Sequence, residues 1–127
     1  MLLKTVLTAS SIYLGLLGVG LLLVPRQFGI DAIPPDASPA LLALFRLFGG
    51  PMLGIAVMNW LARDAPPSAT RNAIVTGNLV GFACVTVNDI WGVASGSARP
   101  QARLFLVIHL FLTVAFVLAR RSRPTNH

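Results

Sequence analysis

Three side chains that can take part in acid–base chemistry stand inside apolar runs of this sequence. Arg46, Asp89 and His109 lie in three different runs, and Asn88 directly precedes Asp89. An ionisable side chain inside a membrane costs roughly 2.5–3.5 kcal/mol on insertion scales, so it normally faces a partner or a wet cavity. A carboxylate and an imidazole can transfer protons, and a guanidinium can stabilise negative charge. These three residues are therefore the candidate catalytic residues.

The distances of these residues from the helix ends predict that they lie at one depth. Arg46 and His109 each stand seven residues from the same end of their predicted helices, which is roughly 10 Å deep at the α-helical rise. Asp89 stands about five residues from that end, roughly 8 Å deep. We therefore expect an arginine, a carboxylate, the Asn88 amide and an imidazole from three helices to converge at one level.

Other polar residues extend the candidate site. Asn78 precedes Asp89 by eleven residues, three helical turns, so the two share a face. Asn59 is predicted to lie deeper, in the same half of the membrane as Asn78. We expect Asn88, Asn78, Asn59 and Trp91 to bind the substrate.

A structural interpretation of the same residues stays open. Arg46 and Asp89 can simply neutralise each other, because a buried charge needs a partner. The asparagines can be interhelical hydrogen-bonding residues. His109 can be a core residue with its hydrogen bonds satisfied.

No established catalytic or metal motif is present. The sequence has no His-Glu-x-x-His, no paired cysteines, no phosphate-binding glycine loop and no nucleophile elbow. One histidine and one carboxylate are too few for a protein-only metal site, and His127 stands in the tail. We therefore expect no metal and no cofactor. The candidate chemistry is cofactor-free isomerisation, cyclisation or epoxide opening.

Four predicted membrane helices must position these residues. Of 127 residues, 55% are hydrophobic and 11% are charged, whereas a soluble domain carries about 25% charged residues. A bilayer-spanning helix needs about 20 apolar residues, and four runs meet this length: residues 5–24, 39–62, 71–94 and 102–119. The fold class is all-α, an integral membrane four-helix bundle that forms a single membrane domain over residues 1–127. We interpret the first run as a retained helix, not a cleaved signal peptide.

Small residues and caps mark where helices approach and begin. Glycines on one flank of a helix allow a neighbour to come close, and three sets fit this pattern: Gly15, Gly18 and Gly20; Gly50 and Gly54; Gly77 and Gly81. Ser38 followed by Pro39 predicts a helix start. Residues 25–38 are predicted to be a turn-rich connection.

The basic residues predict the topology. The net charge of +6 lies mainly at the ends of apolar runs, which indicates a membrane protein and not a nucleic-acid-binding one. Four spans place both termini on one side, and six lysines and arginines lie there against three on the other. They are Lys4, Arg63, Arg71, Arg120, Arg121 and Arg123 against Arg26, Arg99 and Arg103. We expect a bacterial inner membrane protein with both termini in the cytoplasm.

Two segments carry a resemblance to a known family. Val24-Pro25-Arg26-Gln27-Phe28 closes the first predicted helix, and Arg46-Leu47-Phe48-Gly49-Gly50 lies inside the second. Over about its first half, the chain resembles small bacterial four-helix membrane proteins of the DoxX-like type. Most such proteins have no assigned activity, so the resemblance implies a fold more than a function.

Three functions fit these features. The first is binding of a lipophilic small molecule or lipid in an intramembrane polar pocket, with acid–base chemistry by an isomerase, cyclase or hydrolase. The second is a transporter or channel subunit, in which Asn59, Asn78 and Asp89 form a path; because four helices enclose little space, it predicts a homo-oligomer or a paired homologue. The third is an accessory assembly subunit.

Overall fold

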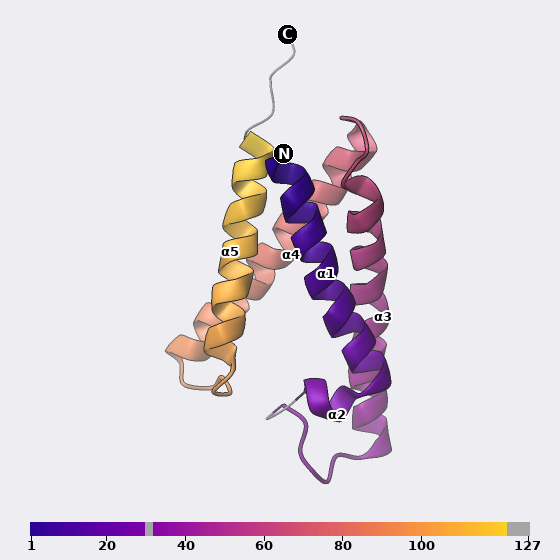
Figure 1. The fold of residues 1–127 in the computed structure, drawn as a ribbon. Helices are drawn as coiled ribbons and strands as arrows, with labels where there is room; N and C mark the ends of the chain where they lie inside the picture. Colours follow the sequence, from indigo (N-terminus) through magenta and orange to yellow (C-terminus); the bar gives the residue numbers. More distant parts are fainter. Residues whose placement is uncertain (30–31, 122–127) are drawn as a thin grey trace. The chain divides into compact units, whose positions relative to one another are not determined.

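The computed structural model describes residues 1–29 and 32–121, and this part of the chain is all-α. Its helices are α1 (Leu2–Leu23), α2 (Pro25–Phe28), α3 (Pro39–Ala62), α4 (Ala69–Ala94) and α5 (Ala102–Arg121) (Figure 1). Helices α1, α3, α4 and α5 are each long and apolar enough to cross a membrane. The predicted all-α class with four membrane spans is therefore confirmed, and both bounds of each of these four helices lie within three residues of the predicted ones.

The helices form two compact units. The α1–α3 unit is Leu7–Leu61, and the α4–α5 unit is Met1–Val6 with Ala62–His127. The first turn of α1 thus belongs to the α4–α5 unit. Each unit has its own interhelical contacts, and the single membrane domain stays a prediction.

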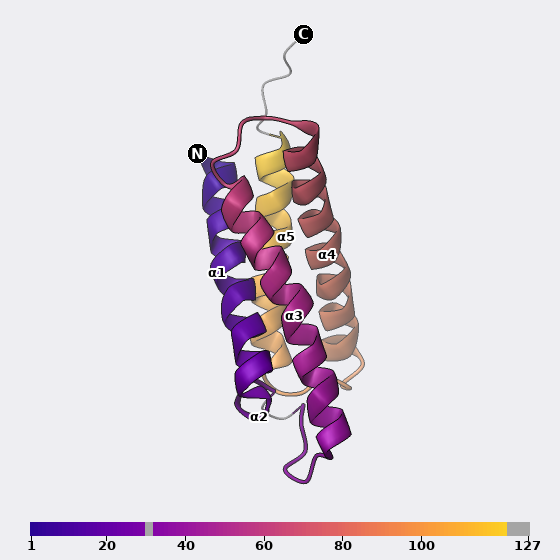
Figure 2. The ribbon, with the colours of Figure 1, turned by 90° about the vertical axis from the view of Figure 1, so that its right-hand side faces the viewer.

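Glycine brings α1 and α3 together within the α1–α3 unit. The two helices lie side by side and antiparallel in both views (Figures 1 and 2). A Cβ added at Gly18 would lie 2.8 Å from the Leu53 nitrogen, and one at Gly49 would lie 2.6 Å from the Gly18 carbonyl oxygen. The two backbones therefore touch at a point where no side chain fits, as predicted for Gly18.

The partner of Gly18 differs from the predicted pair of glycines on α3. A Cβ added at Gly50 or Gly54 meets no atom within 4 Å among the described residues. Gly49 makes the contact, because one residue along a helix turns the face by about 100°. The prediction that Gly50 and Gly54 pack against a neighbouring helix is therefore wrong for this unit.

Two hydrogen bonds join the same helices further along. The Ser11 hydroxyl donates to the Ala56 carbonyl oxygen at 2.7 Å. The Asn59 amide nitrogen donates to the Ser10 hydroxyl at 3.0 Å, and both of these side chains are fully buried. Polar groups buried among apolar helices need such partners, since each unsatisfied one costs several kcal/mol.

The connection from α1 to α3 is more ordered than the turn-rich segment predicted from its prolines. Pro25 starts the one-turn helix α2, and its fixed φ suits a first helical position. The Arg26 guanidinium donates to the carbonyl oxygens of Pro35 and Ala37 at 2.7 and 3.3 Å. Asp31, also part of the predicted connection, lies outside the described residues.

Serine caps begin two of the long helices. The Ser38 hydroxyl accepts from the Leu41 amide at 3.2 Å, which confirms the predicted start of α3. The Ser68 hydroxyl accepts from the Arg71 amide at 3.2 Å. This cap starts α4 at Ala69, two residues before the predicted start.

An ion pair brings the N-terminus to the connection between α3 and α4. Lys4 Nζ lies 2.6 Å from Asp64 Oδ1, and both side chains are more than half exposed. The hydrogen bond from Lys4 lowers the pKa of the Asp64 carboxyl. The ion pair places the N-terminus and the connection between α3 and α4 at the same end of the helices. This is expected when successive spans cross the membrane in alternating directions. The basic tail continues through residues 122–127, outside the described residues.

The glycine contact predicts opposite effects at adjacent positions of α3. Gly49→Ala places a methyl group against the Gly18 backbone, so we expect the free energy of unfolding to fall by about 1–3 kcal/mol. Gly50→Ala meets no atom within 4 Å and should leave stability equal or slightly higher, because alanine favours helix. Thermal unfolding in one detergent measures both, and equal effects would contradict the contact.

The ion pair predicts a weak dependence of stability on acid. The Asp64 carboxyl should titrate below its ordinary pKa of 3.8. Its stabilising contribution is complete above that value and is lost as the pH falls through the lowered pKa. Carbon-13 NMR of the carboxyl measures the midpoint, which should rise in Lys4→Gln. A midpoint that Lys4→Gln leaves unchanged would contradict the pair.

Candidate functional site

The α4–α5 hairpin carries its buried residues at helical spacing. Helices α4 and α5 are antiparallel neighbours in both views, joined by residues 95–101 (Figures 1 and 2). The buried residues of the two helices recur every three or four positions: Val75, Asn78, Phe82 and Thr86 on α4; Leu112, Phe116 and Ala119 on α5. Asp89 continues the first series three residues after Thr86, and His109 precedes Leu112 by three. This register turns both ionisable side chains to the same helical seam.

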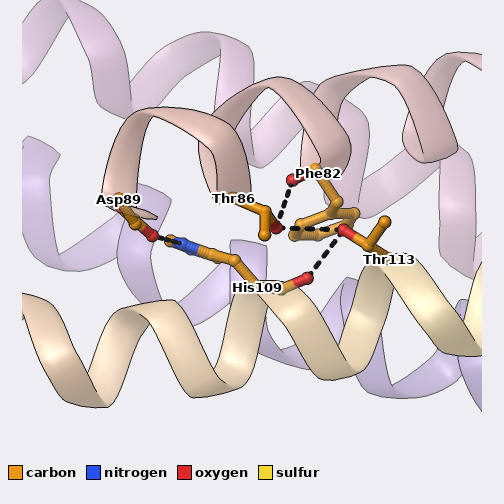
Figure 3. Close-up of polar contacts among 5 residues, drawn as sticks. All are labelled: Phe82, Thr86, Asp89, His109 and Thr113. Atoms are coloured by element: carbon orange, nitrogen blue, oxygen red, sulfur yellow. Dashed lines mark hydrogen bonds and ion pairs between the residues drawn. The ribbon is translucent and has the colours of Figure 1, made fainter. Parts of the chain in front are cut away.

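Asp89 and His109 form a short hydrogen bond across the hairpin. His109 Nδ1 lies 2.6 Å from Asp89 Oδ2 (Figure 3). The two side chains are only 12% and 13% exposed. A separation this short has a proton between the two atoms and is typical of a charge-assisted bond. The prediction that these two residues lie at one level of their helices is confirmed by this contact; their catalytic role stays a prediction.

Two aromatic rings flank the imidazole. The Phe105 ring lies on the same helix, stacked at 6.1 Å and 24° to the His109 ring. The Phe82 ring of α4 lies at 6.2 Å, tilted by 38°, and stacks in turn on Phe116 at 5.9 Å. The hydrogen bond to Asp89 and these two rings together limit rotation of the imidazole.

A pair of threonines lies one helical turn from the ionisable pair. Thr86 and Thr113 bring their hydroxyl oxygens to 3.1 Å (Figure 3). The Thr86 hydroxyl also lies 2.7 Å from the Phe82 carbonyl oxygen, and the Thr113 hydroxyl 2.8 Å from that of His109. Two hydroxyls carry two protons, one too few for three separate hydrogen bonds. The hydrogen bond between the two hydroxyls therefore forms only when one threonine divides its proton between two acceptors or gives up its hydrogen bond to the carbonyl oxygen of its own helix.

The threonines are the part of the α4–α5 seam that the sequence does not single out. Neither Thr86 nor Thr113 stands out in the sequence among the apolar residues around it. The signal is in the spacing. Thr86 precedes Asp89 by three residues, and Thr113 follows His109 by four. In an antiparallel hairpin with Asp89 opposite His109, these offsets place the two hydroxyls opposite each other.

The remaining predicted site residues of α4 differ from one another in burial. Asn78 is buried on the seam, and its amide donates to the Ile74 carbonyl oxygen of its own helix at 2.9 Å. Asn88 is exposed beside Asp89, and Trp91 is 73% exposed. Trp91 thus has the exposure expected of an interfacial residue, and substrate binding by all three stays a prediction.

Arg46 and Asn59 belong to the α1–α3 unit. Arg46 is exposed on α3, and its predicted position at the level of Asp89 and His109 stays a prediction. Asn59 is fully buried and bonded to Ser10, which favours the interpretation of this residue as an interhelical hydrogen-bonding residue over a path for transport.

Comparisons with known proteins add no identity. The chain matches no protein family, no curated protein and no solved structure. The resemblance to DoxX-like proteins therefore stays a prediction. Among residues 1–29 and 32–121, no three His, Cys, Asp or Glu side chains gather where they could hold a metal ion.

The hydrogen bond predicts a characteristic pattern of stability changes. Asp89→Leu leaves the buried imidazole without its carboxylate, so we expect a loss of about 1–3 kcal/mol. His109→Leu should cost a similar amount. The double variant should recover most of the loss, because two leucines suit an apolar helix pair. The free energies of unfolding of the unmodified protein, the two single variants and the double variant, measured in mixed micelles, give the coupling energy between the two residues.

Asn88→Leu is the matched control for this cycle, because Asn88 is the exposed neighbour of Asp89. It should leave stability nearly unchanged. Strictly additive losses in Asp89→Leu and His109→Leu would contradict the bond as a source of stability.

Proposed function

We propose that this four-span membrane protein binds a lipophilic small molecule with one polar end at the Asp89–His109 pair, and that the pair exchanges a proton with it. The supporting observation is the 2.6 Å hydrogen bond between two ionisable side chains on membrane-spanning helices. Such residues are costly inside a membrane and mark functional sites by default. A molecule dissolved in the bilayer can reach a helical seam without crossing water.

The geometry suits His109 as the residue that touches the ligand. When Asp89 is ionised, His109 Nδ1 carries a proton, and this N–H group donates a hydrogen bond to the carboxylate. Nε2 lies on the opposite side of the ring, turned away from Asp89. Nε2 can take a proton from a ligand when the imidazole is neutral and return it when the imidazole is charged. Asp89 then acts as a positioning residue that also stabilises the charged ring.

The proposed chemistry is cofactor-free acid–base work. In an isomerisation, His109 Nε2 would remove a proton from one carbon and return it to another, so that no electron acceptor is needed. Cyclisation and epoxide opening likewise need a proton donated to an oxygen or carbon. Asn88 and Trp91, exposed on α4 near Asp89, are proposed to contact the ligand as it arrives from the lipid.

The proposed setting is the bacterial inner membrane with both termini in the cytoplasm. The bias of basic residues supports this orientation. The ion pair between Lys4 and Asp64 supports a common end for the N-terminus and the connection between α3 and α4. Both orientations leave Asp89 and His109 at the same relative depth.

Lipids retained during purification test the proposal. The protein is purified in mild detergent, and its lipophilic molecules are extracted and quantified by mass spectrometry. A specific species should be retained by the unmodified protein and be reduced about tenfold in His109→Gln, which removes the imidazole as a hydrogen-bonding partner of the ligand. Thr113→Val, one turn away on the same helix, should retain it. Identical extracts from His109→Gln and the unmodified protein would contradict the proposal.

A further inference from the structure

At the loop end of the hairpin, a cationic side chain lies over the aromatic ring that neighbours the imidazole. The Arg99 guanidinium carbon lies 5.2 Å from the centre of the Phe105 ring. That ring is stacked 6.1 Å from the His109 ring. Arg99, Phe105 and His109 therefore form a series of neighbouring groups, called the column below, between the connecting loop and the Asp89–His109 pair.

The loop holds Arg99 in a defined position. The Ala98 amide donates to the Gly92 carbonyl oxygen at 2.9 Å, which folds the loop back onto the end of α4. The Arg99 carbonyl oxygen accepts from the Ala102 amide at 3.0 Å, at the start of α5. Gly96 makes the turn with a φ of +72°, a conformation that suits glycine. The column therefore begins from a fixed backbone.

The charge at this end of the hairpin is positive. Arg99 and Arg103 lie within or next to the loop, and the sequence has no acidic residue after Asp89. Asp89 itself bonds to His109. An anionic group at the membrane surface is therefore attracted to the loop end of this hairpin.

We propose that the ligand of the Asp89–His109 pair is an anionic amphiphile whose carboxylate or phosphate is bound by Arg99. This inference rests on the proposed function and names the class of ligand. A guanidinium binds such groups through two parallel hydrogen bonds. The ligand lies along Phe105, with its charged group at the loop and its reacting carbon at His109. Its headgroup and reacting carbon are thus separated by about one aromatic side chain.

Binding by Arg99 can be distinguished from a general attraction to positive charge, because Arg99 and Arg103 carry the same charge at different positions. Arg103 is exposed on the first turn of α5 and carries the same charge. Arg99 lies over Phe105, and the column to His109 begins there. Arg103→Gln is therefore the matched control for Arg99→Gln.

The test uses two probes with one chain length, dodecanoate and dodecanol, added to full-length protein in phosphatidylcholine nanodiscs. A His127→Gln background leaves His109 as the single histidine of the chain. Nitrogen-15 NMR of the imidazole then reports binding at the site. We expect dodecanoate to shift the His109 signals at lower concentration than dodecanol does. Arg99→Gln should weaken dodecanoate binding about tenfold, as the loss of a charged partner does, while Arg103→Gln changes it little.

The outcomes separate the inference from the proposed function. Equal losses in Arg99→Gln and Arg103→Gln, or equal affinities for the two probes, would overturn the anionic ligand and leave binding at His109 intact. A His109 signal that responds to neither probe would overturn the inference and count against the proposed function as well. The melting temperature of each variant, measured without probe, shows that the fold is retained.

Discussion

The α4–α5 hairpin depends on the hydrogen bond between Asp89 and His109, because neither side chain can be buried alone among apolar helices. At 2.6 Å the imidazole and the carboxyl group are hydrogen-bonded to each other, so each has a partner. The seam around them follows from the same register: Phe82 packs on His109 and Phe116, and Thr86 meets Thr113. Two leucines would suit this seam nearly as well, so stability alone does not require an ionisable pair here.

The helices of the two units are held together by different contacts. Helices α1 and α3 use backbone contact at Gly18 and Gly49, together with the buried bond from Asn59 to Ser10. Such contacts are the usual means by which membrane helices pack. Helices α4 and α5 instead place a carboxylate and an imidazole on their seam. The polar residues of the first unit thus have a structural explanation, whereas Asp89 and His109 have the geometry of an acid–base pair.

The sequence predicts the helices well because four long apolar runs have few alternatives in a membrane. It also predicts that Asp89 and His109 lie at one depth, since depth along two antiparallel helices follows from residue counts. It fails for the glycines of α3, where Gly49 and not Gly50 makes the contact, because run lengths do not give the rotation of a helix about its axis. Thr86 was missed for a related reason: a threonine in an apolar run becomes notable only when its partner across the seam is known.

The central claim is that Asp89 orients the His109 imidazole so that Nε2 is the atom that exchanges protons with a ligand. Nitrogen-15 NMR of His109 in the His127→Gln background tests it most directly, since it shows which ring nitrogen carries a proton. The account predicts a protonated Nδ1 in the resting protein and loss of this preference in Asp89→Leu. An unprotonated Nδ1 with the proton on Nε2, unchanged in Asp89→Leu, would contradict the account.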